Sequence, residues 1–67
     1  MSKRAAVVDP WLQAIDDLER QMIAAHDEKI LLGVSAEEVA RFRPAVVAQA
    51  RAIAAQRRLE YHARMHR

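Results

Sequence analysis

Two histidines near the end of the chain, His62 and His66, have a spacing that could bind a metal ion. Residues four apart on a helix share one face, and imidazole nitrogens are common zinc ligands. A zinc site needs at least three protein ligands, and the third histidine, His26, lies far along the sequence unless a dimer brings it close. The pattern therefore predicts polar residues at a helix end, with no metal and no cofactor.

Carboxylates and hydroxyls are the other groups that could support catalysis. Asp16–Asp17 and Glu37–Glu38 are adjacent pairs, and successive helical residues point about 100° apart, so neither pair forms a two-carboxylate site. The chain has no cysteine, and its serines are Ser2 and Ser35, of which Ser35 is better placed to cap a helix. The one glycine, Gly33, cannot supply a glycine-rich phosphate loop. We therefore expect a protein that is not an enzyme.

A group of arginines makes the C-terminal end basic and is our candidate partner-binding site: Arg57, Arg58, Arg64 and Arg67. Guanidinium groups bind carboxylates on proteins and phosphates on nucleic acids. Only one aromatic residue, Tyr61, lies among them, whereas proteins that bind single strands stack bases on several aromatics. The sequence therefore favours an acidic protein surface, with nucleic-acid binding as the alternative.

The size and composition of the chain point to a small helical domain that needs a partner. A chain of 67 residues buries only about 60% of its unfolded surface, and without cysteine it has no disulfide to compensate. The missing cysteine fits a reducing cytoplasm, where we expect the protein. No run of about 18 apolar residues exists, so we expect no membrane span. Residues 1–33 carry four basic and six acidic side chains, and residues 34–67 carry seven and three, which favours two complementary arms.

The stretch around Gly33 predicts the end of one helix and the start of another. Glycine ends helices because it adopts the left-handed conformation without a Cβ clash. Ser35 and Glu38 have the spacing of a capping box, and Val34 and Val39 flank it as a hydrophobic staple. These local signals agree on a turn at the middle of the chain.

The first arm reads as one helix over residues 10–32. Asp9 is a favourable N-cap, and Pro10 is favoured at the first helical position. Its apolar residues follow a heptad spacing, at Trp11, Ile15, Leu18, Met22 and Ala25, and a second row lies about 100° away, at Leu12, Ile23 and Ile30. Together the rows cover more of the helix than one neighbouring helix needs, so we expect more than one contact.

The second arm reads as a short helix over 36–42 and a long alanine-rich helix over 44–66. Pro44 lacks an amide hydrogen and clashes with the carbonyl of Ala40 inside a helix, so it is better placed as a first helical residue. We therefore expect a break near Arg43, and a single kinked helix is the alternative.

Folding the arms back at Gly33 predicts which residues meet. Residues at equal distances from the turn should be neighbours in an antiparallel hairpin. The expected pairs are Ile30 with Val46 or Val47, Ile23 with Ile53, Ile15 with Tyr61, Trp11 with Met65, and Glu19 with Arg57. Apolar residues meet apolar residues along the whole length, which supports the hairpin.

The fold that we predict is therefore all-α, an antiparallel helical hairpin of two long helices joined by a short one, which dimerises into a four-helix bundle. Residues 1–8 are expected to be a flexible arm and residues 9–67 a single domain. The residues expected in the core or the dimer interface are Trp11, Ile15, Leu18, Met22, Ile53 and Tyr61.

No motif names a family, but in size and layout the chain resembles small helical-hairpin regulators that bacteria and their phages make. That likeness covers the overall plan and transfers no functional residue. The wide apolar arc of the first helix, the small size of the chain and the lack of catalytic groups lead us to expect a homodimer that binds a larger protein and inhibits or modulates it. The alternatives are a nucleic-acid-binding regulator that uses the basic C-terminal helix, and a structural subunit of a larger assembly.

Overall fold

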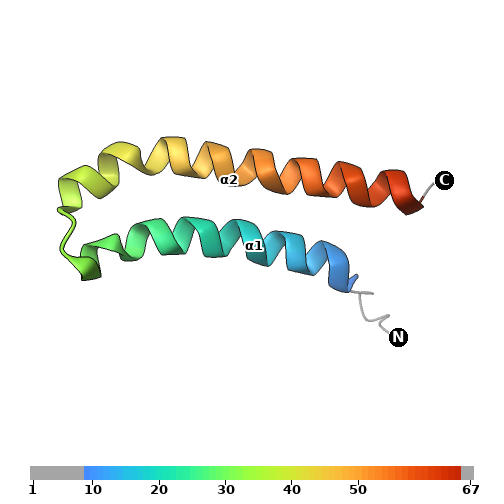
Figure 1. The fold of residues 1–67 in the computed structure, drawn as a ribbon, viewed down its shortest axis with the longest axis horizontal. Helices are drawn as coiled ribbons and strands as arrows, with labels where there is room; N and C mark the ends of the chain where they lie inside the picture. The colour runs from blue at the N-terminus through green and yellow to red at the C-terminus, as the bar shows by residue number, and fades with distance from the viewer. Residues whose placement is uncertain (1–8, 66–67) are drawn as a thin grey trace, which may run out of the picture.

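The computed structural model describes residues 9–65 and contains two long antiparallel helices (Figure 1). Helix α1 spans Pro10–Asp27, a 3₁₀ helix η1 spans Glu28–Leu32, and α2 spans Ala36–Met65. The two ends of the described chain lie at the same end of the hairpin. The all-helical hairpin predicted from the sequence is confirmed, while the expected arm 1–8 lies outside the described residues.

The start of α1 follows the predicted capping pattern. Asp9 has an extended backbone, and its carboxylate accepts a hydrogen bond from the amide of Trp11 at 2.9 Å. Pro10 occupies the first turn, where its missing amide hydrogen costs nothing. The predicted end of this helix needs a correction, because the α-helix stops at Asp27 and the chain reaches Leu32 as a 3₁₀ helix. Tightening of this kind is common where an α-helix ends.

The turn is built as the local sequence predicts. Gly33 has a φ of 99°, its amide donates to the carbonyl of Ile30, and the amide of Val34 donates to that of Lys29, both at 3.1 Å. This pair of hydrogen bonds satisfies carbonyls that the helix end would otherwise leave free. On the far side, the hydroxyl of Ser35 accepts the amide of Glu38 at 3.1 Å, which caps α2.

Helix α2 runs without a break through Pro44, so the predicted separate helices over 36–42 and 44–66 are wrong. The ring of Pro44 removes one helical hydrogen bond, the one that the carbonyl of Ala40 would accept. The helix bends instead of ending, and Figure 1 shows its first turns inclined to the remainder. Strong helix formers on both sides of Pro44 keep the helix continuous, as in the kinked-helix alternative.

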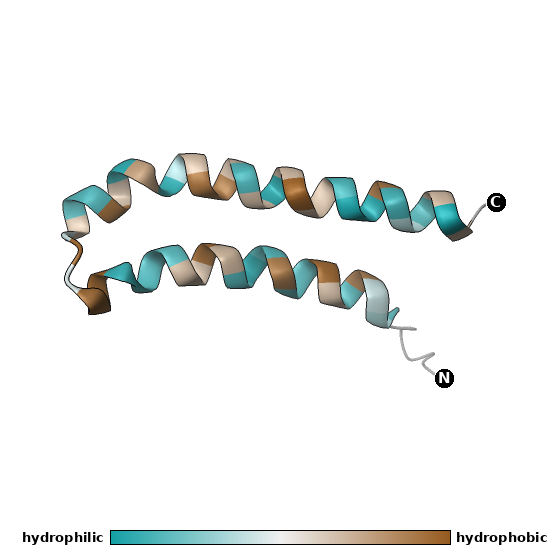
Figure 2. Ribbon diagram, viewed as in Figure 1, coloured by the Kyte–Doolittle hydropathy of each residue, from teal (hydrophilic) through white to brown (hydrophobic). Residues whose placement is uncertain are grey.

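The core between the helices is thin. Among residues 9–65, the buried hydrophobic residues are Val39, Ala50 and Ala54, and no large side chain is fully buried. Large apolar side chains about half exposed or more are Trp11, Ile30, Leu31, Leu32, Phe42, Leu59 and Met65. Figure 2 shows hydrophobic residues along both helices and at the tip of the hairpin. The helices of residues 9–65 lack the combination of length and hydropathy that a membrane span requires.

Candidate functional site

One face of the hairpin, which we call the ionic face, carries the ion pairs between the helices. They are Arg43–Asp27 at 3.0 Å, Arg51–Glu19 at 3.8 Å, Arg58–Asp16 at 2.5 Å and Arg58–Glu19 at 3.7 Å. The three arginines are eight and seven residues apart, so they lie along one side of α2. All of these side chains are at least partly exposed, so each pair contributes only about 0–1 kcal/mol. The pairs therefore fix the register of the helices more than they stabilise them.

The other face, which we call the apolar face, has no such network. Its α1 row consists of Trp11, Leu18 and Met22, and its α2 row consists of Phe42, Val46, Ile53, Arg57 and Arg64. The spacings in both rows are four or seven residues, which keeps each row on one side of its helix. No residue in either row is fully buried. The hairpin alone therefore leaves this face uncovered.

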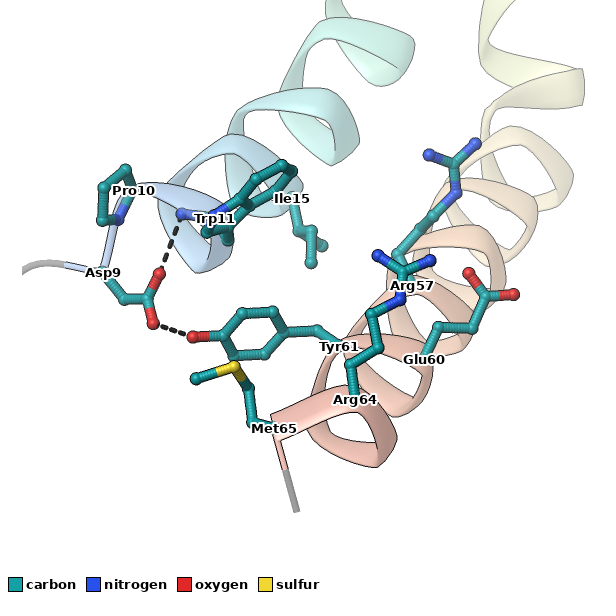
Figure 3. A pocket seen from close by; sticks show the side chains of 9 residues that line it. All are labelled: Asp9, Pro10, Trp11, Ile15, Arg57, Glu60, Tyr61, Arg64 and Met65. Atoms are coloured by element: carbon teal, nitrogen blue, oxygen red, sulfur yellow. Dashed lines mark hydrogen bonds between the residues drawn. The ribbon is translucent and has the colours of Figure 1, made fainter. Parts of the chain in front are cut away.

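At the open end of the apolar face lies a cleft of about 620 Å³, which we call the open-end cleft. It is lined by Asp9, Pro10, Trp11, Ile15, Arg57, Glu60, Tyr61, Arg64 and Met65, shown in Figure 3. The hydroxyl of Tyr61 donates a hydrogen bond to the carboxylate of Asp9 and so ties α2 to the cap of α1. Trp11 is 68% exposed beside it. The cleft brings together the residue pairs Ile15 with Tyr61 and Trp11 with Met65, as the sequence predicts.

The hydrogen bond across this end shifts the pKa of both partners. The pKa of Asp9 is lowered, mainly because its carboxylate accepts from Tyr61 and also because it accepts backbone amides. The pKa of Tyr61 is raised, mainly because its hydroxyl donates to Asp9. Both shifts favour the same pair, an ionised Asp9 and a neutral Tyr61.

The four predicted partner-binding arginines do not form one cluster. Arg57 and Arg64 line the open-end cleft, and neither has an ion pair within residues 9–65. Arg58 belongs to the ionic face, and its hydrogen bond to Asp16 raises its pKa. Arg67 lies outside the described residues. The split arises because Arg57 and Arg58 are neighbours, which point about 100° apart on a helix.

The expected pairing of Glu19 with Arg57 is also wrong. Glu19 pairs with Arg51 and Arg58 instead, because Arg57 points about 100° away from Arg58 around α2. This rotation places Arg57 in the open-end cleft together with Arg64. Figure 3 shows both side chains rising from α2 on the same side.

A second hollow of about 370 Å³ lies at the turn end of the apolar face, and we call it the turn-end cleft. It is lined by His26, Lys29, Val34, Glu38, Val39, Phe42 and Val46. Nε2 of His26 donates to the carbonyl of Val39 at 2.8 Å, and the side chain is buried. Because a carbonyl only accepts, this contact places the proton on Nε2 and leaves the buried Nδ1 without a partner.

The six predicted core or dimer residues are all incompletely buried in the hairpin. Ile15, Leu18, Met22, Ile53 and Tyr61 are half-buried, and Trp11 is exposed. Ala50 and Ala54 are the fully buried residues instead, and the sequence shows them only as part of an alanine-rich helix. The sequence also assigns Glu38 only as a cap, although it shares a cleft with Phe42. The four- and seven-residue spacing on α2 is the signal that could have joined Phe42 to Arg57 and Arg64.

Within residues 9–65, no three histidine or carboxylate side chains are placed to hold a metal ion. His66, one of the two histidines with a metal-like spacing, lies outside that range. Comparison with models of protein families, with curated proteins and with solved structures found no match.

Proposed function

We propose that this chain is a non-enzymatic interaction module, a helical hairpin that dimerises into a four-helix bundle and binds a larger protein to inhibit or modulate it. The observation that carries the proposal is the uncovered apolar face. Trp11 is 68% exposed and Phe42 is 50% exposed, while the fully buried core between the helices is mostly alanine. Exposed apolar patches of this kind mark interaction surfaces.

A second copy is the simplest cover for this face. Hairpins complete a core by packing face to face, and a four-helix bundle is the common result for two antiparallel hairpins. In that arrangement the half-buried Leu18, Met22 and Ile53 would become the centre of a shared core. Burying one such side chain contributes about 1.5–3 kcal/mol, which is large beside the stability of a chain of this size.

Binding of a larger protein would use the surfaces that the dimer leaves exposed. The ionic face carries three arginines, of which Arg43 and Arg51 each pair with one carboxylate and Arg58 pairs with two. An acidic partner could compete for these guanidinium groups because exposed ion pairs are weak. Arg58, which lies nearest the open end, remains our candidate contact there.

The dimer is tested by light scattering across a concentration series. Leu18→Asp places a charge on the apolar face and should abolish the dimer. Ala24→Asp is the matched control, because Ala24 is an exposed α1 residue outside that face, and it should dimerise like the wild type. A monomeric wild type, or an unchanged Leu18→Asp dimer, would contradict the proposal.

Capture of a partner then tests the second half of the function. A larger protein that recognises the dimer should bind the wild type and not the Leu18→Asp variant, and Arg58→Gln should weaken its binding. Equal recovery of the same protein by all three chains would argue against a regulatory dimer.

A further inference from the structure

The two clefts lie at opposite ends of the same face and differ in the charges that they leave unpaired. At the open end, the cationic Arg57 and Arg64 have no ion pair within residues 9–65, whereas Asp9 is held by Tyr61. At the turn end, the carboxylate of Glu38 has no ion pair in the same range. Unpaired positive charge therefore lies at Arg57 and Arg64 in one cleft, and unpaired negative charge lies at Glu38 in the other.

The remaining charges in the two clefts are complementary as well. Glu60 lines the open-end cleft, where its only hydrogen bond within residues 9–65 is a long one from Gln56 at 3.4 Å. Lys29 lines the turn-end cleft and has no ion pair in the described part of the chain. Each cleft also presents one exposed aromatic ring, Trp11 at one end and Phe42 at the other.

We infer that a second copy of this chain covers the apolar face head to tail, so that the open-end cleft of each hairpin meets the turn-end cleft of the other. The two-fold axis of this dimer lies in the interface, perpendicular to the helices and midway along them. It generates both contacts at once, because a symmetric interface repeats every pair. Arg64 of each copy then faces Glu38 of the other, and Trp11 packs near Phe42. This inference rests on the proposed dimer and adds its direction.

The opposite arrangement, with both copies pointing the same way, is unfavourable. It would place Arg57 and Arg64 of both copies at the same end of the bundle, where their guanidinium groups would repel. Juxtaposed like charges select against a wrong arrangement, and unlike charges fix the register of the right one. The charge pattern of the face therefore specifies direction as well as contact.

Charge reversal separates the two arrangements by the sign of the effect. In the head-to-tail dimer, Arg64→Glu and Glu38→Arg should each weaken dimerisation at least about tenfold. In the same-direction dimer, Arg64→Glu would relieve repulsion and tighten dimerisation. Sedimentation velocity at about 50 mM salt measures the dissociation constants, because low salt preserves exposed electrostatics.

Mixing the two single variants gives the decisive result. Glu38 and Arg64 lie 26 positions apart on the same helix, about 39 Å along its axis, so they cannot pair within one hairpin. An equal mixture of Arg64→Glu and Glu38→Arg should form a heterodimer, since both of its contacts join unlike charges. Its affinity, and that of the double variant with itself, should return to within about threefold of the wild type.

Two variants on the outer side of α2 serve as controls. Glu37→Arg matches Glu38→Arg in charge and in distance from the helix start, and Leu59→Glu adds a negative charge near the open end. Both should dimerise like the wild type, and loss of the dimer in Leu59→Glu would assign the interface to the outer side of α2 instead. If a single variant is unfolded by circular dichroism, the mixture still decides, because refolding on mixing supports the inference.

Several results would overturn the head-to-tail dimer. They are a tighter Arg64→Glu dimer, single variants that dimerise as the wild type does, and a mixture that fails to recover. If Leu18→Asp still abolishes the dimer in those cases, the proposed function stands and only its direction is wrong. If the wild type itself is monomeric, the proposed function fails.

Discussion

The two ends of the hairpin are held together by different kinds of interaction. At the turn end, a buried hydrogen bond from His26 to Val39 joins α1 to α2, and backbone hydrogen bonds around Gly33 cap the end of η1. At the open end, the tie is a hydrogen bond from Tyr61 to Asp9 beside an open cleft. Buried hydrogen bonds are costly to break, whereas exposed ones compete with water. The helices are therefore joined more firmly at the turn end than at the open end.

The largest effect is expected at the turn end, from His26→Ala. The change removes a buried hydrogen bond and leaves a cavity, so the free energy of unfolding should fall by about 2–4 kcal/mol. Urea unfolding at one fixed protein concentration measures it, since dimerisation adds to apparent stability. Gln13→Ala, at an exposed α1 position, should change little. A loss below about 1 kcal/mol for His26→Ala would remove the distinction between the ends.

The contact between the two helices midway along the hairpin is tested by Ala54→Leu. Ala54 is fully buried, so a larger side chain should push the helices apart and cost about 1–3 kcal/mol. Its neighbour Ala55 is exposed, and Ala55→Leu is the control that should leave thermal unfolding nearly unchanged. Equal melting temperatures for the two variants would show that the helices do not meet at Ala54.

The conformation of the turn is tested by Gly33→Ala. No atom lies within 4 Å of an added Cβ, so the cost comes from the positive φ alone and should be about 1–2 kcal/mol. Gly33→Asn should cost less, because asparagine tolerates the left-handed region better. Thermal unfolding of the wild type, Gly33→Asn and Gly33→Ala measures this order of melting temperatures. A ranking with alanine above asparagine would contradict the helix-end geometry.

The smallest effect is expected at the open end, from Tyr61→Phe, because its hydrogen bond is near the surface. Asp9 has a lowered pKa, so its contribution is present above its unfolded pKa near 3.8 and is lost as the pH falls. Tyr61 has a raised pKa, so its contribution is present below its unfolded pKa near 10.0 and is lost as the pH rises. The difference in melting temperature between wild type and variant should thus be flat between these values and shrink progressively outside them.

Local signals in the sequence were enough for the helix ends and the hairpin. Asp9, Gly33 and Ser35 act on backbone groups within a few residues, so their roles do not depend on the rest of the fold. Pro44 was harder, because the cost of a helical proline competes with the propensity of the residues around it. The competition is decided over the whole helix and not at one position.

The candidate surface depended on a rotation that the sequence does not show. Arg57 lies on the apolar face of α2 and Arg58 lies on the ionic face. Because the two residues point about 100° apart, a rotation of the helix about its axis would exchange their environments. The ion pairs of Arg58 with Asp16 and Glu19 reveal which way the helix faces. The sequence gives the row spacing, but the structure was needed to set that row against Trp11.

The antiparallel hairpin also has a consequence for the order in which it folds. His26 and Val39 are 13 residues apart in sequence, whereas Tyr61 and Asp9 are 52 apart, a fourfold longer loop. Each doubling of a loop adds about 0.6 kcal/mol of closure entropy, so contacts should zip from the turn towards the ends. Amide exchange should then be slowest in the helical turns around His26 and Val39 and fastest near Trp11 and Met65. The last segments to close are those that carry the open-end cleft, so assembly with a second copy would complete folding there.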